Sequence, residues 1–259
     1  MPTTYWLKFG DTPLGYNGSA LKTEYAVPGR LSITCNASIS GSGFDTTKQF
    51  GCTITFNAVV PYTLDGVAQT PASSVHLLLV KDQTTLIGNL PVGTTYSIVE
   101  DALSAADNAR GYTNGAVAGA TGTIAEDTTS TAALGFVYAE IKVMGLRLTT
   151  MGTMPAGTTI PVNITLNRAV FYTIDGVEVS TPSDTVSVTV PLDGTVELGG
   201  LPAGSFMAVF GTNATQVEYK NMDSTGRVGT GIYTWSAGRK VVLYNHSGYT
   251  AEARIYEYT

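Results

Sequence analysis

Two cysteines and two histidines are the residues of this chain whose types could carry nucleophilic or metal chemistry. A thiol becomes a nucleophile when a neighbouring base or cation lowers its pKa, and zinc needs four ligands at one point. His76 lies in the apolar stretch SSVHLLLVKD, which favours an exposed or hydrogen-bonded structural role, and His246 follows Asn245 in an expected turn. The sequence contains no G-x-S-x-G, H-E-x-x-H or Walker-type motif. We therefore predict a protein that is not an enzyme and that uses no metal or other cofactor.

Cys35 and Cys52 lie on two stretches, residues 31–39 and 48–56, whose residues alternate between apolar and polar. That period is typical of half-buried strands, and both thiols fall on the apolar side. If the two stretches form a hairpin about the loop SGSGFDTT, residues 35 and 52 lie opposite one another. The geometry then permits a disulfide if the Cα atoms are within about 7 Å. Two buried free thiols, packed as small hydrophobic side chains, are the alternative.

The composition limits the kind of protein. The chain has 259 residues, of which 43% are hydrophobic and 13% charged, with 29 glycines and a net charge of −6. This apolar content predicts a packed core, and the abundance of Thr, Ser, Val and Gly favours strands and turns. An acidic chain without clusters of Lys and Arg is a poor candidate for binding nucleic acid or an anionic membrane. We also expect no membrane span, because no apolar run of about 18 residues occurs, and no signal peptide, because the N-terminus has no basic segment followed by an apolar run.

An internal repeat organises the chain. The segments ITFNAVVPYTLDGV (residues 54–67) and ITLNRAVFYTIDGV (164–177) are identical at nine of 14 positions, with an offset of 110. NLPVGTTYSIV and GLPAGSFMAVF repeat with an offset of 111. Each copy has short alternating stretches between turn residues, and the Asp-Gly pairs at 65–66 and 175–176 favour hairpins. We predict an all-β protein of two tandem Ig-like sandwiches, with one helical turn within residues 102–111.

The domain boundaries follow from the repeat. We place the first sandwich at residues 30–141 and the second at residues 142–259. Residues 1–29 have no counterpart in the repeat and are predicted to form a short β-hairpin that is too small to fold alone. The first strand of that hairpin carries Tyr5, Trp6, Leu7 and Phe9. We predict that this N-terminal arm docks on another protein.

The first copy resembles the collagen-adhesin B-type (Cna-B-like) repeats of Gram-positive surface proteins and pilins. The matching segments are GRLSITCNASISG, KQFGCTITF, LIGNLPVGTTYSIVE, GYT, GTI and LGFVYAE, in the family order over about residues 30–141. They include the pattern Leu-Pro-x-Gly-x-x-Tyr-x-x-x-Glu. The second copy shares the Leu-Pro turn but is more degenerate, with Gly211 where the first copy has Glu100. The resemblance implies that both copies are sandwiches of the same kind.

Many members of that family form an internal isopeptide bond between a lysine on the first strand and an asparagine on the last, promoted by a buried glutamate. The resemblance puts the glutamate at Glu100, the lysine position at Cys35 and the asparagine position at Tyr138. Both reacting side chains are replaced, so we predict a vestigial site without the bond. In the second copy a threonine stands at the lysine position, which leaves Asn245 nothing to react with. Glu100 is then expected to be a strand-end carboxylate bonded to nearby backbone.

These features favour a structural protein of a phage particle, namely a capsid decoration, head-fibre or tail component. It would be located in the virion, dock through residues 1–29 on other virion proteins and form a homo-oligomer, with a host-surface glycan or protein as a further partner. The alternative is a fragment of a Gram-positive pilin or adhesin at the bacterial surface. A second alternative is a carbohydrate-binding module with an exposed aromatic patch, although alternation of core and surface positions explains the same residues. Those aromatic residues are Tyr219, Tyr233, Trp235, Tyr244, Tyr249, Tyr256 and Tyr258.

Overall fold

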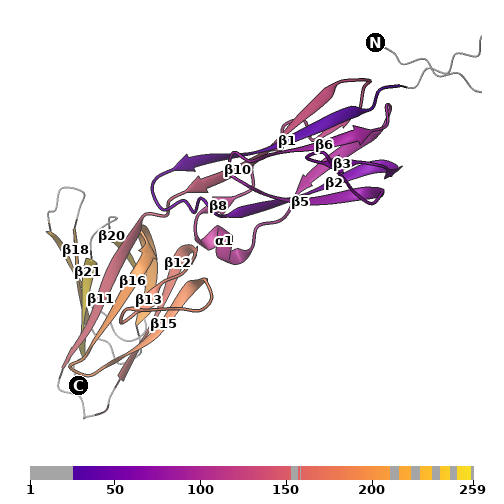
Figure 1. The fold of residues 1–259 in the computed structure, drawn as a ribbon. Helices are drawn as coiled ribbons and strands as arrows, with labels where there is room; N and C mark the ends of the chain where they lie inside the picture. The colour runs from indigo at the N-terminus through magenta and orange to yellow at the C-terminus, as the bar shows by residue number, and fades with distance from the viewer. Residues whose placement is uncertain are drawn as a thin grey trace, which may run out of the picture. The chain divides into compact units, whose positions relative to one another are not determined.

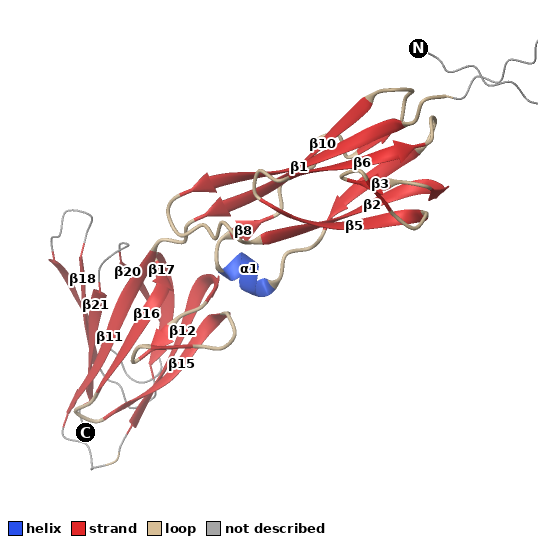
Figure 2. Ribbon diagram, in the orientation of Figure 1, coloured by secondary structure: helices blue, strands red, loops and turns tan. Residues whose placement is uncertain are grey.

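The structure is a computed structural model of the chain. It describes residues 26–152, 157, 159–210, 216–222, 228–234, 240–245 and 250–257. Regular structure in this part of the chain is almost entirely β-strand (Figure 2), so the all-β prediction is confirmed. Its one described helix, α1 (Ala105–Ala109), is the single turn expected within residues 102–111. The helix begins at Ser104, whose side chain and backbone exchange hydrogen bonds with Asp107.

The first sandwich consists of two sheets (Figure 1). In the first sheet β1 lies centrally, between β6 and β10, and in the second sheet β2 lies between β5 and β7. The first sheet has the order β4 (Val67–Ala68), β3 (Thr63–Leu64), β6 (Thr84–Leu90), β1 (Gly29–Ser40), β10 (Thr129–Ala139) and β8 (Tyr112–Thr113). The second sheet has the order β5 (Ala72–Val80), β2 (Gln49–Val60), β7 (Thr95–Glu100) and β9 (Thr121–Thr123).

The second sandwich repeats this strand order, which confirms the predicted duplication. The hairpin β18–β19 extends its first sheet where the first sandwich has only the short strand β8. That sheet has the order β14 (Val177–Glu178), β13 (Thr173–Ile174), β16 (Thr195–Pro202), β11 (Val143–Gly152), β21 (Thr250–Glu257), β18 (Gln216–Met222) and β19 (Val228–Thr234). The other sheet has the order β15 (Ser183–Pro191), β12 (Thr159–Val170), β17 (Gly204–Phe210) and β20 (Lys240–Asn245).

Close packing divides the described chain into two compact units. The first contains the described residues up to Ser38, together with Asp45–Ala102 and Asn114–Val137. The second contains Ile39–Phe44, Leu103–Thr113 and the described residues from Tyr138 onward. The boundary near residue 141 therefore remains a prediction from the sequence repeat. The compact units are divided differently, because residues 39–44 and 103–113 belong to the second unit.

Alternating residues build the core of each sandwich. On β1, Leu31, Ile33 and Cys35 are fully buried, while the residues between them are exposed or partly exposed. The same alternation buries every second residue of β12 from Ile160 to Leu166. Burying one face of each strand against the opposite sheet is the main stabilising contribution, at about 25 cal/mol per Å² of apolar surface removed from water.

The repeated Asp-Gly pairs form the hairpins that the sequence predicts. Asp65 and Asp175 adopt positive φ angles of 47° and 49°, and a glycine follows each of them. The Asp65 carboxylate accepts a hydrogen bond from Leu86 N at 2.8 Å, and the Asp175 carboxylate accepts one from Glu197 N at 2.8 Å. The motif is repeated because the aspartate makes the turn and also fastens it to the neighbouring strand.

The hairpin between residues 31–39 and 48–56, which the facing of the two cysteines across a ladder would require, does not form. β1 pairs with β6, and β2 pairs with β5 and β7, so the two strands belong to opposite sheets. The chain crosses from one sheet to the other between them. Alternation determines which face of a strand is buried but not which strand is its partner, so the inward side of both strands could be predicted and the crossing could not.

Candidate functional site

Three of the residues singled out in the sequence lie together in the first sandwich. Cys35 on β1 and Cys52 on β2 are fully buried and face the core from opposite sheets. Glu100, at the end of β7, is the register partner of Cys52. Both thiols are free in this structure. The pair therefore lies across the sandwich instead of across a hairpin ladder.

The surroundings of the two thiols suppress their reactivity. Burial is the main cause that raises the pKa of Cys35 from 9.0 to about 11, and the negative charge of Glu100 is the next. Burial also raises the pKa of Cys52 to about 11, with further contributions from Asp101, Glu100 and Cys35. Since the thiolate is the nucleophile and the metal ligand, thiols of this kind are inert near neutral pH.

Glu100 ties two distant parts of the first sandwich together. Its Oε1 accepts a hydrogen bond from Gly135 N on β10 at 2.8 Å, and its Oε2 accepts one from Asn114 Nδ2 at 3.1 Å. Asn114 Nδ2 also donates to Asp101 O at 2.9 Å. Bonds to a charged carboxylate are stronger than bonds between neutral groups. Glu100 is thus a structural carboxylate, and Asn114 and Gly135 are its partners.

The sequence reasoning missed Asn114 and Gly135. The signal for the second of them is a glycine on a buried strand, which often marks a close approach of backbone. Here a Cβ on Gly135 would lie 2.3 Å from Ala116 O, and one on Gly115 would lie 1.7 Å from Gly135 O. Both glycines let the segment after Asn114 pass directly against β10.

Tyr138 does not join this group. Its hydroxyl donates to Ser42 O at 2.7 Å, and its ring centroid lies 5.0 Å from that of Tyr112 and 5.7 Å from that of Phe44. The preceding inward residue of β10, Phe136, is buried and stacks on Phe50 with 4.2 Å between ring centroids. The structure therefore brings Cys35 and Glu100 together and leaves Tyr138 in an aromatic cluster of its own.

The register gives the matching positions of the second sandwich. Leu31 pairs with Ile87 and Leu146 pairs with Leu198, which makes Thr150 the counterpart of Cys35. Val162 is the counterpart of Cys52 and pairs with Phe210, which is therefore the counterpart of Glu100. All three residues are buried. Gly211, which the sequence aligns with Glu100, lies outside the described residues.

Thr150 is the one polar residue of that second group. Its hydroxyl donates a hydrogen bond to Pro191 O, so the polar atom is satisfied within the core. The backbone of Asn245 ends β20 and pairs with Gly204. The second sandwich thus has a threonine, a valine and a phenylalanine where the first has two thiols and a carboxylate.

His76 pairs with an aspartate on the outer face of the first sandwich. Its Nε2 lies 2.7 Å from Asp101 Oδ2, and both side chains are about half exposed. The pair passes over Gly51, where a Cβ would lie 2.0 Å from the same Asp101 oxygen. Such a solvent-open pair links β5 to the end of β7, which is the hydrogen-bonded structural role that the sequence favours.

Several predicted features lie outside what the structure describes. These are the N-terminal arm with Tyr5, Trp6, Leu7 and Phe9, and, among the late aromatic residues, Trp235, Tyr249 and Tyr258. Tyr219 is 4% exposed and belongs to the core of the second sandwich, so it cannot stack on a glycan. In the described part of the chain, no group of three or more His, Cys, Asp or Glu side chains is arranged to hold a metal. No helix there is long and apolar enough to cross a membrane.

Comparison with known families and structures gives one match in sequence and several in fold. Residues 29–136 match a family described as a domain of unknown function (DUF7601). No curated protein matches the chain. The shaft pilin SpaA from Lactobacillus rhamnosus GG is similar with a TM-score of 0.35 and 11% identity, covering 90% of this chain and 100% of the pilin. The major pilin T3.2 from Streptococcus pyogenes gives 0.33 and 12%, covering 89% and 97%.

A third similar structure is the pilus-presented adhesin Spy0125 (Cpa), with a TM-score of 0.33 and 18% identity. The match covers 46% of this chain, which spans only 28% of the adhesin. Identities this low describe a likeness of β-sandwich architecture. The chain is thus an all-β protein of two sandwiches, and its residues 29–136 match the DUF7601 family.

Proposed function

We propose that this chain is a non-enzymatic, load-bearing structural protein that presents two tandem sandwiches at a cell surface. The observation that carries the proposal is the position of the first and last strands of each sandwich. A protein that holds two objects together transmits force through its ends. The strands nearest those ends decide how the force is resisted.

In the second sandwich the first strand, β11, and the last strand, β21, lie side by side and run parallel. Their register extends over eight residue pairs, from Gly145 with Thr250 to Gly152 with Glu257. Force applied at the two ends of such a pair slides one strand along the other. All the hydrogen bonds of the ladder then share the load, whereas an antiparallel hairpin pulled at its open end breaks one pair at a time.

The first sandwich has the same arrangement. Its first and last strands, β1 and β10, are neighbours in the sheet (Figure 1). Arg30 N donates to Thr128 O at 2.8 Å at one end of this pair, and Glu140 N donates to Ser40 O at 2.9 Å at the other. Residue numbers rise together on both strands, so they also run parallel. Two sandwiches that follow one another along the chain, each with its first and last strands loaded in shear, suit a stalk or shaft.

The interior polar groups of the first sandwich fit this proposal. Cys35 and Cys52 are buried with raised pKa values, and both carboxylate oxygens of Glu100 accept hydrogen bonds from within the sandwich. Groups held in this way stabilise a scaffold and present no reactive nucleophile to a substrate. The replaced lysine and asparagine positions imply that the stalk resists force through hydrogen bonds and packing alone.

We propose that the protein is part of a surface structure such as a pilus or adhesin. The named structures of similar fold are pilins and a pilus-presented adhesin, and the sequence motifs resemble the same group. The phage-particle role that the sequence favours finds no support among these comparisons. Docking through residues 1–29 remains part of the proposal as the attachment of the stalk to its base.

Single-molecule force spectroscopy on the full chain tests the proposal. Pulling at the two ends should give two unfolding events, one for each sandwich. Each event should lengthen the chain by roughly 35–40 nm, because about 110 residues extend at about 3.3–3.6 Å per residue. A handle at Val177→Cys, on the edge hairpin β13–β14, provides the control, because pulling from there to the C-terminus peels strands from the edge of the sheet.

The end-to-end geometry should require the higher force, because it loads the β11–β21 ladder in shear. The force at which a sandwich ruptures is governed by its unfolding rate under load. Equal forces in the two geometries would contradict the load-bearing role, as would unfolding without a resolved force peak. Val177 suits the handle because its side chain is 71% exposed, so a thiol there leaves the core intact.

A further inference from the structure

One outer face of the second sandwich carries two rows of polar side chains across four strands, β16, β11, β21 and β18. The registers place Arg147 beside Glu197 on one side and Glu252 on the other, and Glu252 beside Lys220. The first row therefore reads, strand by strand, Glu197, Arg147, Glu252, Lys220. The second row reads Thr195, Thr149, Arg254, Glu218. We call these eight residues the charged face.

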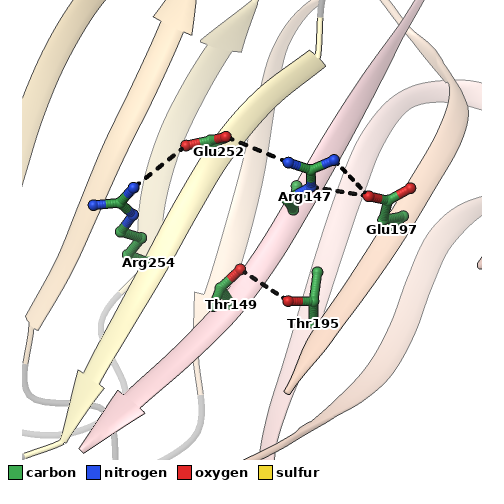
Figure 3. Close-up of a pocket in the computed structure, with 6 residues that line it drawn as sticks. All are labelled: Arg147, Thr149, Thr195, Glu197, Glu252 and Arg254. Carbon is green, nitrogen blue, oxygen red and sulfur yellow. Dashed lines mark hydrogen bonds and ion pairs between the residues drawn. The ribbon is translucent and has the colours of Figure 1, made fainter. Parts of the chain in front are cut away.

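Figure 3 shows how the side chains of three of the strands meet. Arg147 donates to Glu197 Oε1 through Nε at 2.9 Å and through a second nitrogen at 2.7 Å, and it lies 3.6 Å from Glu252 Oε1. Arg254 lies 3.9 Å from Glu252. The arginine and glutamate side chains are 37–58% exposed and line an open hollow of about 630 Å³. The charges thus lie at the surface with free space in front of them.

The corresponding sheet of the first sandwich forms without these charges. Thr34 and Thr84 are bonded at 2.8 Å, as the equivalent Thr149 and Thr195 are at 3.3 Å, so the two faces share a framework. Ser32 and Leu86 stand where Arg147 and Glu197 stand in the second sandwich. The outward residues of β10 carry no charge either. The charged face is therefore a particular property of the second sandwich.

We infer that the charged face binds the same face of a second copy of this chain. The first row alternates in sign, negative, positive, negative, positive, over four adjacent strands. A two-fold axis parallel to the strands, passing between β11 and β21, reverses the order of the strands in the partner copy. Glu197 then faces a lysine, Arg147 faces a glutamate, and the same two contacts recur on the other side of the axis.

The second row is compatible with the same axis. Thr149 faces Arg254 of the other copy, and Thr195 faces Glu218, so each charged group meets a hydroxyl and no like charges meet. Strands about 4.8 Å apart keep the rows of both copies in step. The face spans only four strands, so the contact is small and belongs to the weak, transient class. Its strength depends on salt, because exposed charges are screened within about 10 Å at 0.1 M.

Sedimentation of the full chain over a range of protein concentrations tests this inference. At about 0.02 M salt the average mass should rise from monomer towards dimer as the protein is concentrated, and at about 0.5 M salt it should stay lower. Arg147→Glu places like charges opposite one another twice in the dimer, and so does Glu252→Arg. Each variant alone should dimerise at least about tenfold more weakly than the wild type.

The decisive sample is an equimolar mixture of these two variants. In a mixed dimer, the glutamate at 147 faces the arginine at 252 in one contact, and the native arginine at 147 faces the native glutamate at 252 in the other. Mixing should therefore restore association that neither variant shows alone. Ser32→Glu is the matched control, because it introduces a glutamate at the position in the first sandwich that corresponds to 147, and it should leave dimerisation unchanged.

Folding is followed in the same samples by the thermal unfolding midpoint, so that a misfolded variant is recognised. If the rows serve only to hold the sheet of one molecule together, the single variants lower that midpoint and mixing them changes nothing. That result would overturn the inference. A wild-type chain that stays monomeric at low salt and high concentration would overturn it as well.

Discussion

The two sandwiches share one framework but have different side chains at three corresponding interior positions. At these positions the first sandwich has Cys35, Cys52 and Glu100, and the second has Thr150, Val162 and Phe210. Glu100 collects hydrogen bonds from a crossing loop and from β10, whereas Phe210 is 1% exposed and fills the core. The strand order and the Asp-Gly hairpins are the same in both.

The framework therefore does not depend on which residues fill these positions. A carboxylate needs donors, so the first sandwich has Asn114 and a close approach at Gly135. A phenyl ring needs only volume. Each filling is stable in its own surroundings, and substitutions at Phe210 and Glu100 test whether the two can be exchanged.

The largest effect is expected when the second sandwich receives the carboxylate of the first. Phe210→Glu puts an acid among the apolar side chains of the core of the second sandwich. It should lower the free energy of unfolding of the second sandwich by about 4 kcal/mol or more. Urea titration with amide hydrogen exchange reads the two sandwiches separately. Phe210→Leu is the control and should cost only about 1–2 kcal/mol; an equal loss in both variants would show that shape, not charge, is what matters.

Removing the carboxylate from the first sandwich should have a smaller effect. Glu100→Ala leaves Gly135 N and the Asn114 amide without their acceptor and should cost about 1.5–3 kcal/mol. The amide of Gly135 should also lose protection against hydrogen exchange. Glu100→Gln keeps an acceptor and should cost less. If both variants are as stable as the wild type, Glu100 is dispensable and the comparison between the two positions fails.

Alkaline pH should destabilise the first sandwich more than the second, because both cysteines of the chain lie in the first. Cys35 and Cys52 have their pKa values raised from 9.0 to about 11 in the fold. Between those values the unfolded chain loses thiol protons that the folded chain keeps, so stability is full below pH 9 and falls above it. The expected loss is on the order of 1 kcal/mol per thiol for each pH unit between 9 and 11.

Cys52→Val, which copies the second sandwich, should halve that dependence on pH. The measurement is urea unfolding of the first sandwich at several pH values between 8 and about 10.5. Intact mass accompanies it, since a disulfide between the two residues lowers the mass by about 2 Da and removes both titrations. A wild-type protein with the lower mass would decide the redox question in favour of the bond.

The sequence predicted those features that depend on local or periodic signals. Alternation identified Cys35 and Cys52 as inward-facing, and the Asp-Gly pairs identified the hairpins. The partner strand of β1 could not be predicted, because β6 lies about 50 residues further along the chain and alternation carries no information on pairing. The bond from Asn114 to Glu100 was missed for the same reason, since it depends on where a loop crosses the sheet.

The counterpart of Glu100 was missed by one residue, and the structure shows why. Pro91 precedes Ser97 by six residues, whereas Pro202 precedes the equivalent Met207 by five. The turn in the second sandwich is therefore one residue shorter. An alignment made on the proline carries this difference into the strand and selects Gly211, whereas the pairing with β12 selects Phe210.

The smallest effect is expected on the outer faces, where the two sandwiches differ in charge. Arg147→Ser gives the second sandwich the residue that the first has at position 32, and it removes the contacts to Glu197 and Glu252. Exposed ion pairs contribute little, so the free energy of unfolding should fall by about 0.2–1 kcal/mol at low salt, and by less as salt screens the charges. Thermal unfolding at low and high salt measures this loss of stability.

Ser32→Arg in the first sandwich is the control and should give no gain in stability, because Leu86 offers the arginine no carboxylate. A loss well above 1 kcal/mol that persists in salt would mean that Arg147 stabilises the sheet mainly through the packing of its stem, and the charges would then explain little of the difference between the two faces.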